Sequence, residues 1–221
     1  MEETSSVLFS IGPVEITGTV VTMWVIIAVL AVLSILATRN MKDVPGPLQN
    51  IAEQVVSKLQ GYYGDILGAK MAQKYFPVLA TLFIFIIVSN YSGLIPGAGH
   101  YKGFKVPTAN LSVTAALALV GFFTIHTVGV KERGVGGYLK SFLSVMLPLT
   151  IIEQFTRPFS LALRLYGNLY GEEMVTENLY KLFPVIAPLL MNVLSLLFCL
   201  IQALVFTMLL SIYISEAAGE E

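Results

Sequence analysis

The sequence predicts an all-α polytopic membrane protein with about five membrane-embedded helices plus one amphipathic surface helix. Of its 221 residues, 56% are hydrophobic and 12% are charged, whereas charged residues make up about a quarter of a soluble domain. Three segments without an ionised side chain each reach the roughly 20 residues that a helix needs to cross a hydrocarbon core of about 30 Å. The whole chain, 1–221, is therefore predicted to form a single membrane domain.

The first three spans are predicted at residues 16–37, 76–95 and 111–130. Residues 182–215 contain no formal charge. A helix of that length would reach roughly 50 Å, so we expect it to tilt or bend in the membrane. Residues 142–180 are apolar but interrupted by charges and prolines, and they predict a second long helix that is kinked near Pro158.

Residues 48–67 predict an amphipathic helix on the cytoplasmic surface of the membrane. Their apolar residues recur at helical spacing with polar residues between them, which is typical of a helix lying in the interface. These apolar residues are Leu48, Ile51, Val55, Val56, Leu59 and Ile66. A packed, soluble helical hairpin is the alternative interpretation.

Lysine and arginine are concentrated after the first and third predicted spans. Because such residues accumulate on the cytoplasmic side, the N-terminus, residues 1–15, is predicted to lie outside. Five crossings then place the C-terminus in the cytoplasm.

The composition also excludes several classes of function. The net charge of −1 leaves no basic surface for nucleic acid. The single cysteine, Cys199, cannot build a disulfide framework. Neither a phosphate-binding loop nor a zinc-protease motif is present. We therefore expect no cofactor, no metal, no nucleotide bound directly and no catalytic activity.

Residues 153–180 bring charged groups into an apolar segment. On a helix that advances 100° per residue, Glu153, Arg157, Arg164, Asn168 and Gly171 form a polar stripe about 60° wide. An arginine at the bilayer centre costs at least about 2.5 kcal/mol, so it usually marks an ion path or a counter-ion. Arg164 is the stronger candidate because apolar residues surround it, whereas Arg157 can pair with Glu153. The alternative for Arg164 is a structural ion pair with a nearby glutamate.

Three glutamates follow Arg164 on the same predicted helix. Glu172 lies about 80° round the helix from Arg164, and Glu173 and Glu177 lie about 180° and 220° round. Pairing with Arg164 along the helix is therefore poor, and we predict that these carboxylates face an ion-accessible cavity at the outer end. A solvated helix terminus is the alternative.

The last helix carries a small polar track. Ser195 and Gln202 are seven residues apart and so share one face of a helix. Ordinary hydrogen bonding between helices is the alternative to an ion path here.

Residues 157–170, RPFSLALRLYGNLY, resemble the signature of subunit a of bacterial-type F-type ATP synthases, a Pro-x-x-Leu-x-x-Arg-Leu-x-x-Asn pattern. Residues 90–96, 107–110 and 201–208 resemble the same family in the same order. The resemblance implies an ion-translocating subunit with two offset half-channels, which couples proton or sodium flow to rotation of a ring of c subunits. It also implies that the last two long helices form a strongly tilted hairpin.

The resemblance assigns roles to individual residues. Arg164 matches the stator arginine that faces the c-ring, and Asn168 and Gln202 match its polar neighbours. Glu173 matches a titratable position of the outer half-channel, and Ser195 matches the position that faces it.

Relatives can carry histidine or glutamate at the position of Ser195. Since this chain has serine there, Glu172 or Glu177 is expected to supply the missing titratable group.

The partners implied are the c-ring on the Arg164 face, subunit b of the stator and membrane lipid, in a bacterial plasma membrane. The alternative function is a secondary ion transporter or channel unrelated to ATP synthase. A transporter would predict repeated halves with broken helices, and the sequence shows no such repeat. A membrane scaffold without an ion path is a further alternative.

Overall fold

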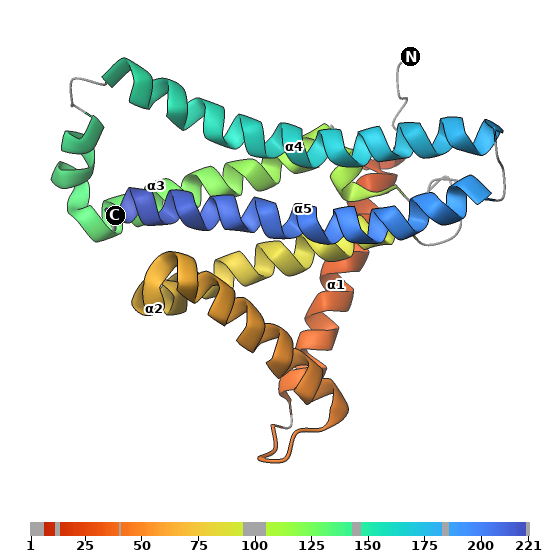
Figure 1. Ribbon diagram of the computed structural model, residues 1–221, viewed down its shortest axis with the longest axis horizontal. Helices are drawn as coiled ribbons and strands as arrows, with labels where there is room; N and C mark the ends of the chain where they lie inside the picture. The colour runs from red at the N-terminus through yellow and green to blue at the C-terminus, as the bar shows by residue number, and fades with distance from the viewer. Residues whose placement is uncertain are drawn as a thin grey trace.

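A computed structural model describes residues 7–11, 14–39, 41–94, 105–142, 147–182 and 186–219. These residues are mostly helical, and the predicted all-α class of membrane protein is confirmed (Figure 1). The helices are α1 (Gly18–Thr38), α2 (Pro47–Ser92), α3 (Leu111–Phe142), α4 (Leu147–Leu182) and α5 (Ile186–Ala218), with a 3₁₀ turn, η1 (Pro107–Ala109), before α3.

Helices α4 and α5 form the long hairpin expected for the end of the chain. They contact each other, and both also contact α3. In Figure 1 they run side by side in opposite directions, and α1 crosses their direction steeply. With 36 and 33 residues, each would extend about 50 Å, which exceeds the thickness of a hydrocarbon core. The hairpin therefore has to tilt if α1 stands across the membrane.

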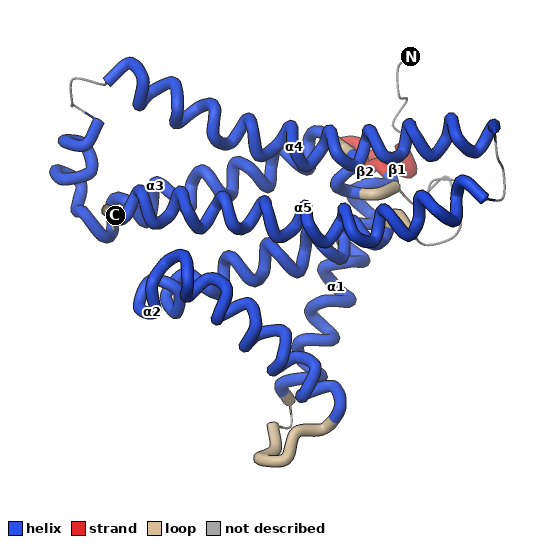
Figure 2. The backbone as a smooth tube through the Cα atoms, in the orientation of Figure 1, coloured by secondary structure: helices blue, strands red, loops and turns tan. Residues whose placement is uncertain are grey.

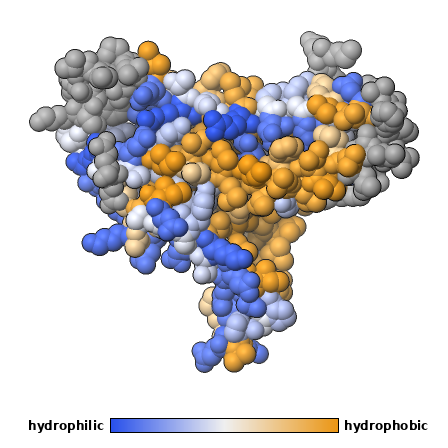
Figure 3. All heavy atoms as spheres, in the orientation of Figure 1, coloured by the Kyte–Doolittle hydropathy of each residue, from blue (hydrophilic) through white to orange (hydrophobic). Residues whose placement is uncertain are grey.

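Four helices of the described part of the chain, α1, α2, α3 and α5, are long and apolar enough to cross a membrane. Helix α4 is as long but carries more charged residues. In Figure 3 apolar atoms cover the middle of the visible face, and hydrophilic atoms interrupt this surface along α4. The charged groups of α4 thus lie on a helix that packs against two apolar ones.

Two glycines bend helices where the sequence predicted connections. Gly68 has φ 73° and ψ 156° inside α2, and Gly134 has φ 72° and ψ 159° inside α3. Side chains other than hydrogen strongly disfavour this conformation. The predicted helix 48–67 and span 76–95 are consequently joined into one element, with the bend at Gly68. The helix predicted at 142–180 begins at Leu147, because residues up to Phe142 belong to α3.

The bend at Gly68 should depend on the absence of a side chain. We expect Gly68→Ala to lower the free energy of unfolding by about 1–3 kcal/mol, because the backbone there is strained for alanine. The measurement is the midpoint temperature of helix loss in the purified, detergent-solubilised subunit. Gly64→Ala is the matched control: Gly64 lies within the regular part of α2, and an added Cβ would meet no atom within 4 Å. Equal effects of the two substitutions would contradict the assignment of the bend to Gly68.

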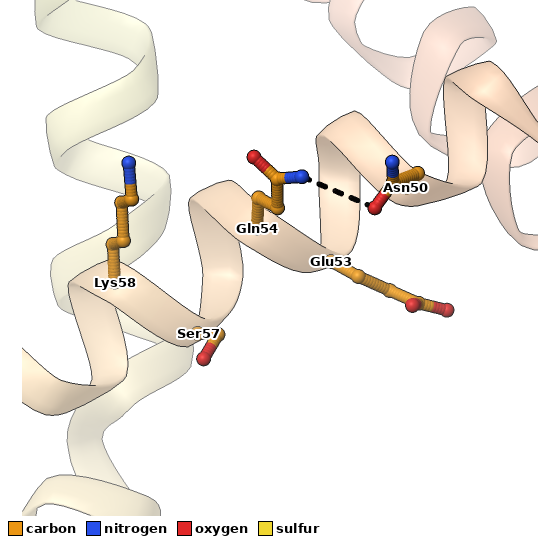
Figure 4. A pocket seen from close by; sticks show the side chains of 5 residues that line it. All are labelled: Asn50, Glu53, Gln54, Ser57 and Lys58. Carbon is orange, nitrogen blue, oxygen red and sulfur yellow. Dashed lines mark hydrogen bonds between the residues drawn. The ribbon is translucent and has the colours of Figure 1, made fainter. Parts of the chain in front are cut away.

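The first part of α2 is amphipathic, in keeping with its sequence pattern. Leu59, Tyr63 and Leu67 are buried, and the Tyr63 hydroxyl donates a hydrogen bond of 2.9 Å to Thr207 Oγ1 of α5. Exposed apolar residues continue the row toward the start of the helix: Leu48, Ile51, Val55 and Val56. Figure 4 shows the polar residues of the same segment, among which Gln54 Nε2 donates to Asn50 Oδ1 at 3.2 Å.

A short β-hairpin precedes α1 and was not predicted. Strands β1 (Val7–Ile11) and β2 (Val14–Thr17) pair antiparallel, with Val7 opposite Thr17 and Ile11 opposite Val14 (Figure 2). Strands of five and four residues are too short for their alternation to be recognised in a sequence this apolar.

Candidate functional site

Arg164 lies on the outer face of α4, away from the packed core. Leu161, Ala162 and Leu165, which surround it in sequence, are buried against the other helices. Arg164 and Leu163 are exposed on the opposite side. This follows from the helical period, since residues three and four apart share a face. Of the stripe predicted from the sequence, Glu153 and Arg164 are exposed, whereas Arg157, Asn168 and Gly171 are partly buried.

The Arg164 guanidinium forms no ion pair with a side chain that the structure describes. The salt bridges found there are Lys74–Glu132, Arg157–Glu153 and Arg157–Glu216. The alternative considered for Arg164, a structural ion pair with a nearby glutamate, is therefore not formed among the described residues. The guanidinium can reach a group on a neighbouring molecule.

The predicted neighbours of Arg164 differ in exposure. Asn168, one turn along α4, is half-buried. Gln202 of α5 is only 7% exposed, and its Nε2 has no hydrogen-bond partner among the described residues. Ser195, on the same face of α5 as Gln202, is 2% exposed. The track along α5 is thus buried inside the bundle, whereas Arg164 points out of it.

Glu172 and Ser195 meet across the α4–α5 interface. The Ser195 hydroxyl lies close to the Glu172 carboxylate. The carboxylate oxygen Oε2 is buried without a partner in the described structure. The neighbouring Glu173 is exposed, which follows from its position 100° further round the helix. The side chain of Glu177 lies outside the described residues.

Further buried polar groups come from α2 and η1, and sequence reasoning did not single them out. Asn90 Nδ2 donates to the Cys199 carbonyl at 3.4 Å, and Tyr91 Oη donates to the Leu196 carbonyl at 3.2 Å. Cys199 in turn lies near Glu172. The end of α2 therefore reaches the part of α5 that faces the Glu172 carboxylate.

Several atoms in these elements lack a hydrogen-bond partner within the described part of the chain. They are Ser89 Oγ, Asn90 Oδ1 and Thr108 Oγ1, in addition to Glu172 Oε2 and Gln202 Nε2. The elements that carry them contact one another: η1 contacts both α2 and α4, and α5 contacts both α2 and α4. An unsatisfied buried polar group costs about 1–3 kcal/mol, so such groups usually bind water or an ion.

Arg157 is engaged, in contrast to Arg164. Its pair with Glu153, predicted from the i to i+4 spacing, is present at 3.4 Å. A shorter contact of 2.6 Å joins Arg157 Nη1 to Glu216 Oε2 of α5. The guanidinium also lies over the ring of Tyr213, 4.7 Å from its centroid. Arg157 thus links α4 to the end of α5.

The family model described as "ATP synthase A chain" matches residues 20–215 of this sequence. The chain belongs to the ATP synthase A chain family. The match within this ATP synthase family covers nearly all of α1 and α5 and everything between them, so it includes Arg164, Glu172, Ser195 and Gln202. The hairpin β1–β2 and Glu216 lie outside it.

Relatives named ATP synthase subunit a align along almost the whole chain. One from a Bradyrhizobium species is 41% identical over 219 residues, 98% of this chain and 95% of the relative. One from Pelobacter propionicus is 43% identical over 204 residues, 89% of this chain and 86% of the relative. One from Moorella thermoacetica is 38% identical over 212 residues, 95% of this chain and 94% of the relative. The resemblance to ATP synthase subunit a seen in the sequence is confirmed.

Proposed function

We propose that this chain translocates ions through the membrane sector of an F-type ATP synthase and that Arg164 is its stator arginine. The single observation that carries the residue assignment is the position of that guanidinium. It projects from the outer face of α4 and has no ion-pair partner in the described structure. A cation in that position is suited to meet a carboxylate on a neighbouring, moving subunit.

The buried polar groups between α2, η1, α4 and α5 are suited to form the outer half-channel. Their unpartnered atoms can hydrogen-bond water within an otherwise apolar bundle, and the oxygens among them can also coordinate a cation. Glu172, which lies close to Ser195, is the carboxylate of this region with a buried, unpartnered oxygen. We assign it the relay position, in preference to the exposed Glu173.

Two half-channels that do not connect directly force each ion through a carboxylate on the c-ring. The membrane potential then contributes about 2.3 kcal/mol per charge for each 100 mV, and this drives the ring forward. Arg164 favours the ionised form of that carboxylate as it passes. Its positive charge also repels a free cation that would otherwise leak between the half-channels.

The protein is a multi-pass membrane protein, and we place its N-terminus outside and its C-terminus in the cytoplasm of a bacterial cell. The distribution of lysine and arginine supports this orientation. The exposed apolar row of α2, Leu48 to Val56, is suited to rest in the cytoplasmic membrane surface. Besides the c-ring, we propose that this chain contacts subunit b of the stator.

Copurification tests this proposal. A tagged copy of the chain, extracted in mild detergent, is expected to bring down a ring of small two-helix subunits together with the soluble ATPase sector. Vesicles containing the purified assembly are expected to acidify, or to accumulate sodium, when ATP is added. Recovery of the tagged chain alone, with intact ion transport, would instead favour the secondary transporter.

A further inference from the structure

Side chains from α3 and α4 meet at one acidic residue near the end of α5, Glu216. Its carboxylate contacts Arg157 of α4 at 2.6 Å. Its backbone carbonyl accepts a hydrogen bond of 2.6 Å from Arg133 Nη2 of α3. Two arginines from two different helices therefore bind the same residue, one through its side chain and one through its backbone.

The backbone at the end of α5 leaves space for the guanidinium of Arg133. Gly219 ends the helix with φ 86°, and its amide donates to the carbonyls of Ser215 and Glu216. A Cβ at Gly219 would lie 2.7 Å from Arg133 Nε and 2.8 Å from Nη2. Only a glycine leaves room for the guanidinium in this position without a shift.

Arg157 contacts α5 at a point where α4 can bend more easily than elsewhere. Pro158 follows it inside the helix and, lacking an N–H, cannot donate the backbone hydrogen bond to Gln154. A helix bends more easily where such a bond is missing. Arg157 is tied to Glu216 and packs on Tyr213, so it holds α4 against α5 at the residue before the proline.

Arg164 lies seven residues beyond Arg157 on the same side of α4. Seven residues correspond to about 10 Å along the axis and to a rotation of about 20°. A tilt or rotation of α4 at Arg157 would therefore displace Arg164 relative to whatever it faces. The positions of the two arginines are mechanically linked.

We propose that Glu216 is a positioning residue that fastens α3 and α4 to α5 through Arg133 and Arg157 and thereby sets the position of Arg164. This inference rests on the proposed function of Arg164. Glu216 lies outside the segment that matches the family model, which ends at residue 215.

The test is a charge exchange in the complete ATP synthase, reconstituted in vesicles. Arg157→Glu and Glu216→Arg are each expected to lower ATP-driven pumping per ATP hydrolysed by at least about threefold, and the double exchange is expected to restore it to within about twofold. Glu153→Gln is the matched control, because Glu153 is the more distant partner of Arg157, and it should pump normally. Single exchanges that pump normally, or a double exchange no better than the worse single one, would overturn the proposal.

Salt dependence provides a second readout for the case in which a reversed charge prevents assembly. The Arg157 and Glu216 side chains are 22% and 47% exposed, so added salt should weaken their attraction. In the wild type, pumping per ATP is expected to fall as salt rises. In Glu216→Gln it should already be low and respond little. A Glu216→Gln variant with the salt response of the wild type would refute the junction.

The reference variant Arg164→Ala separates the two claims. If Arg164→Ala pumps normally, the proposed role of Arg164 fails, whatever the result at Glu216. If Arg164→Ala stops pumping while exchanges at Arg157 and Glu216 have no effect, only the positioning inference fails.

Discussion

Replacing Arg164 with alanine is expected to abolish ATP-driven ion pumping while the complex stays assembled in the membrane. The side chain is exposed on α4 and holds no described partner within the chain, so its removal should cost the fold little. It would remove the cation that favours the ionised ring carboxylate and blocks leakage. The measurement is pumping by vesicles that contain the purified complex, with ATP hydrolysis recorded in parallel.

Arg39→Ala is the matched control for this experiment. Arg39 is also exposed, at the end of α1, and its replacement removes one positive charge without touching the α4 stripe. It should leave pumping within about twofold of the wild type, as expected for a surface substitution. Normal coupled pumping by Arg164→Ala would refute the role assigned to that residue.

Glu172→Gln is expected to slow coupled ion flux by at least about tenfold, because proton transfer through a positioned side chain commonly contributes a hundredfold or more. Glutamine keeps the size of the side chain and can still lie beside Ser195, but it cannot exchange a proton at neutral pH. The measurement is the initial rate of ATP-driven pumping at saturating ATP. The amount of the subunit in the membrane serves as the check on assembly.

The adjacent Glu173→Gln is the natural comparison, since it makes the same chemical change on an exposed part of the same helix. It should reduce flux less than Glu172→Gln does. The opposite order would move the relay to Glu173, the position favoured by the family resemblance. Unchanged flux in both variants would remove both residues from the ion path.

The sequence composition was sufficient to predict the class of fold, because a long apolar segment can form few structures other than a membrane helix. The span predicted at 16–37 is nearly coextensive with α1, Gly18–Thr38. The bends at Gly68 and Gly134 were not predictable in this way. Both glycines are followed by residues that continue a helix, and only the backbone angle distinguishes them from ordinary helical glycines such as Gly64.

The helical period predicted that Arg164 belongs to a polar stripe, and only the family resemblance implied that it faces a neighbouring subunit. The contact between Glu172 and Ser195 was suggested only indirectly, through the family pattern. Asn90 and Thr108 were missed as buried polar groups because serine, threonine and asparagine are frequent in membrane helices and carry little signal alone. Nothing in the sequence singled out Glu216, and only the packing of α5 beside α4 reveals its contact with Arg157.

The exposed side of α4 has one more consequence. On a face about 120–180° round the helix from Arg164, it presents Ile152, Phe155 and Phe159, which are 62%, 71% and 63% exposed. Apolar side chains of this kind attract a neighbour through dispersion and offer no directional bonds that would have to break for it to move. A neighbour on this face, whether lipid or another helix, could shift along α4 without breaking such bonds, whereas the charged, position-specific group at Arg164 lies on a different side of the helix.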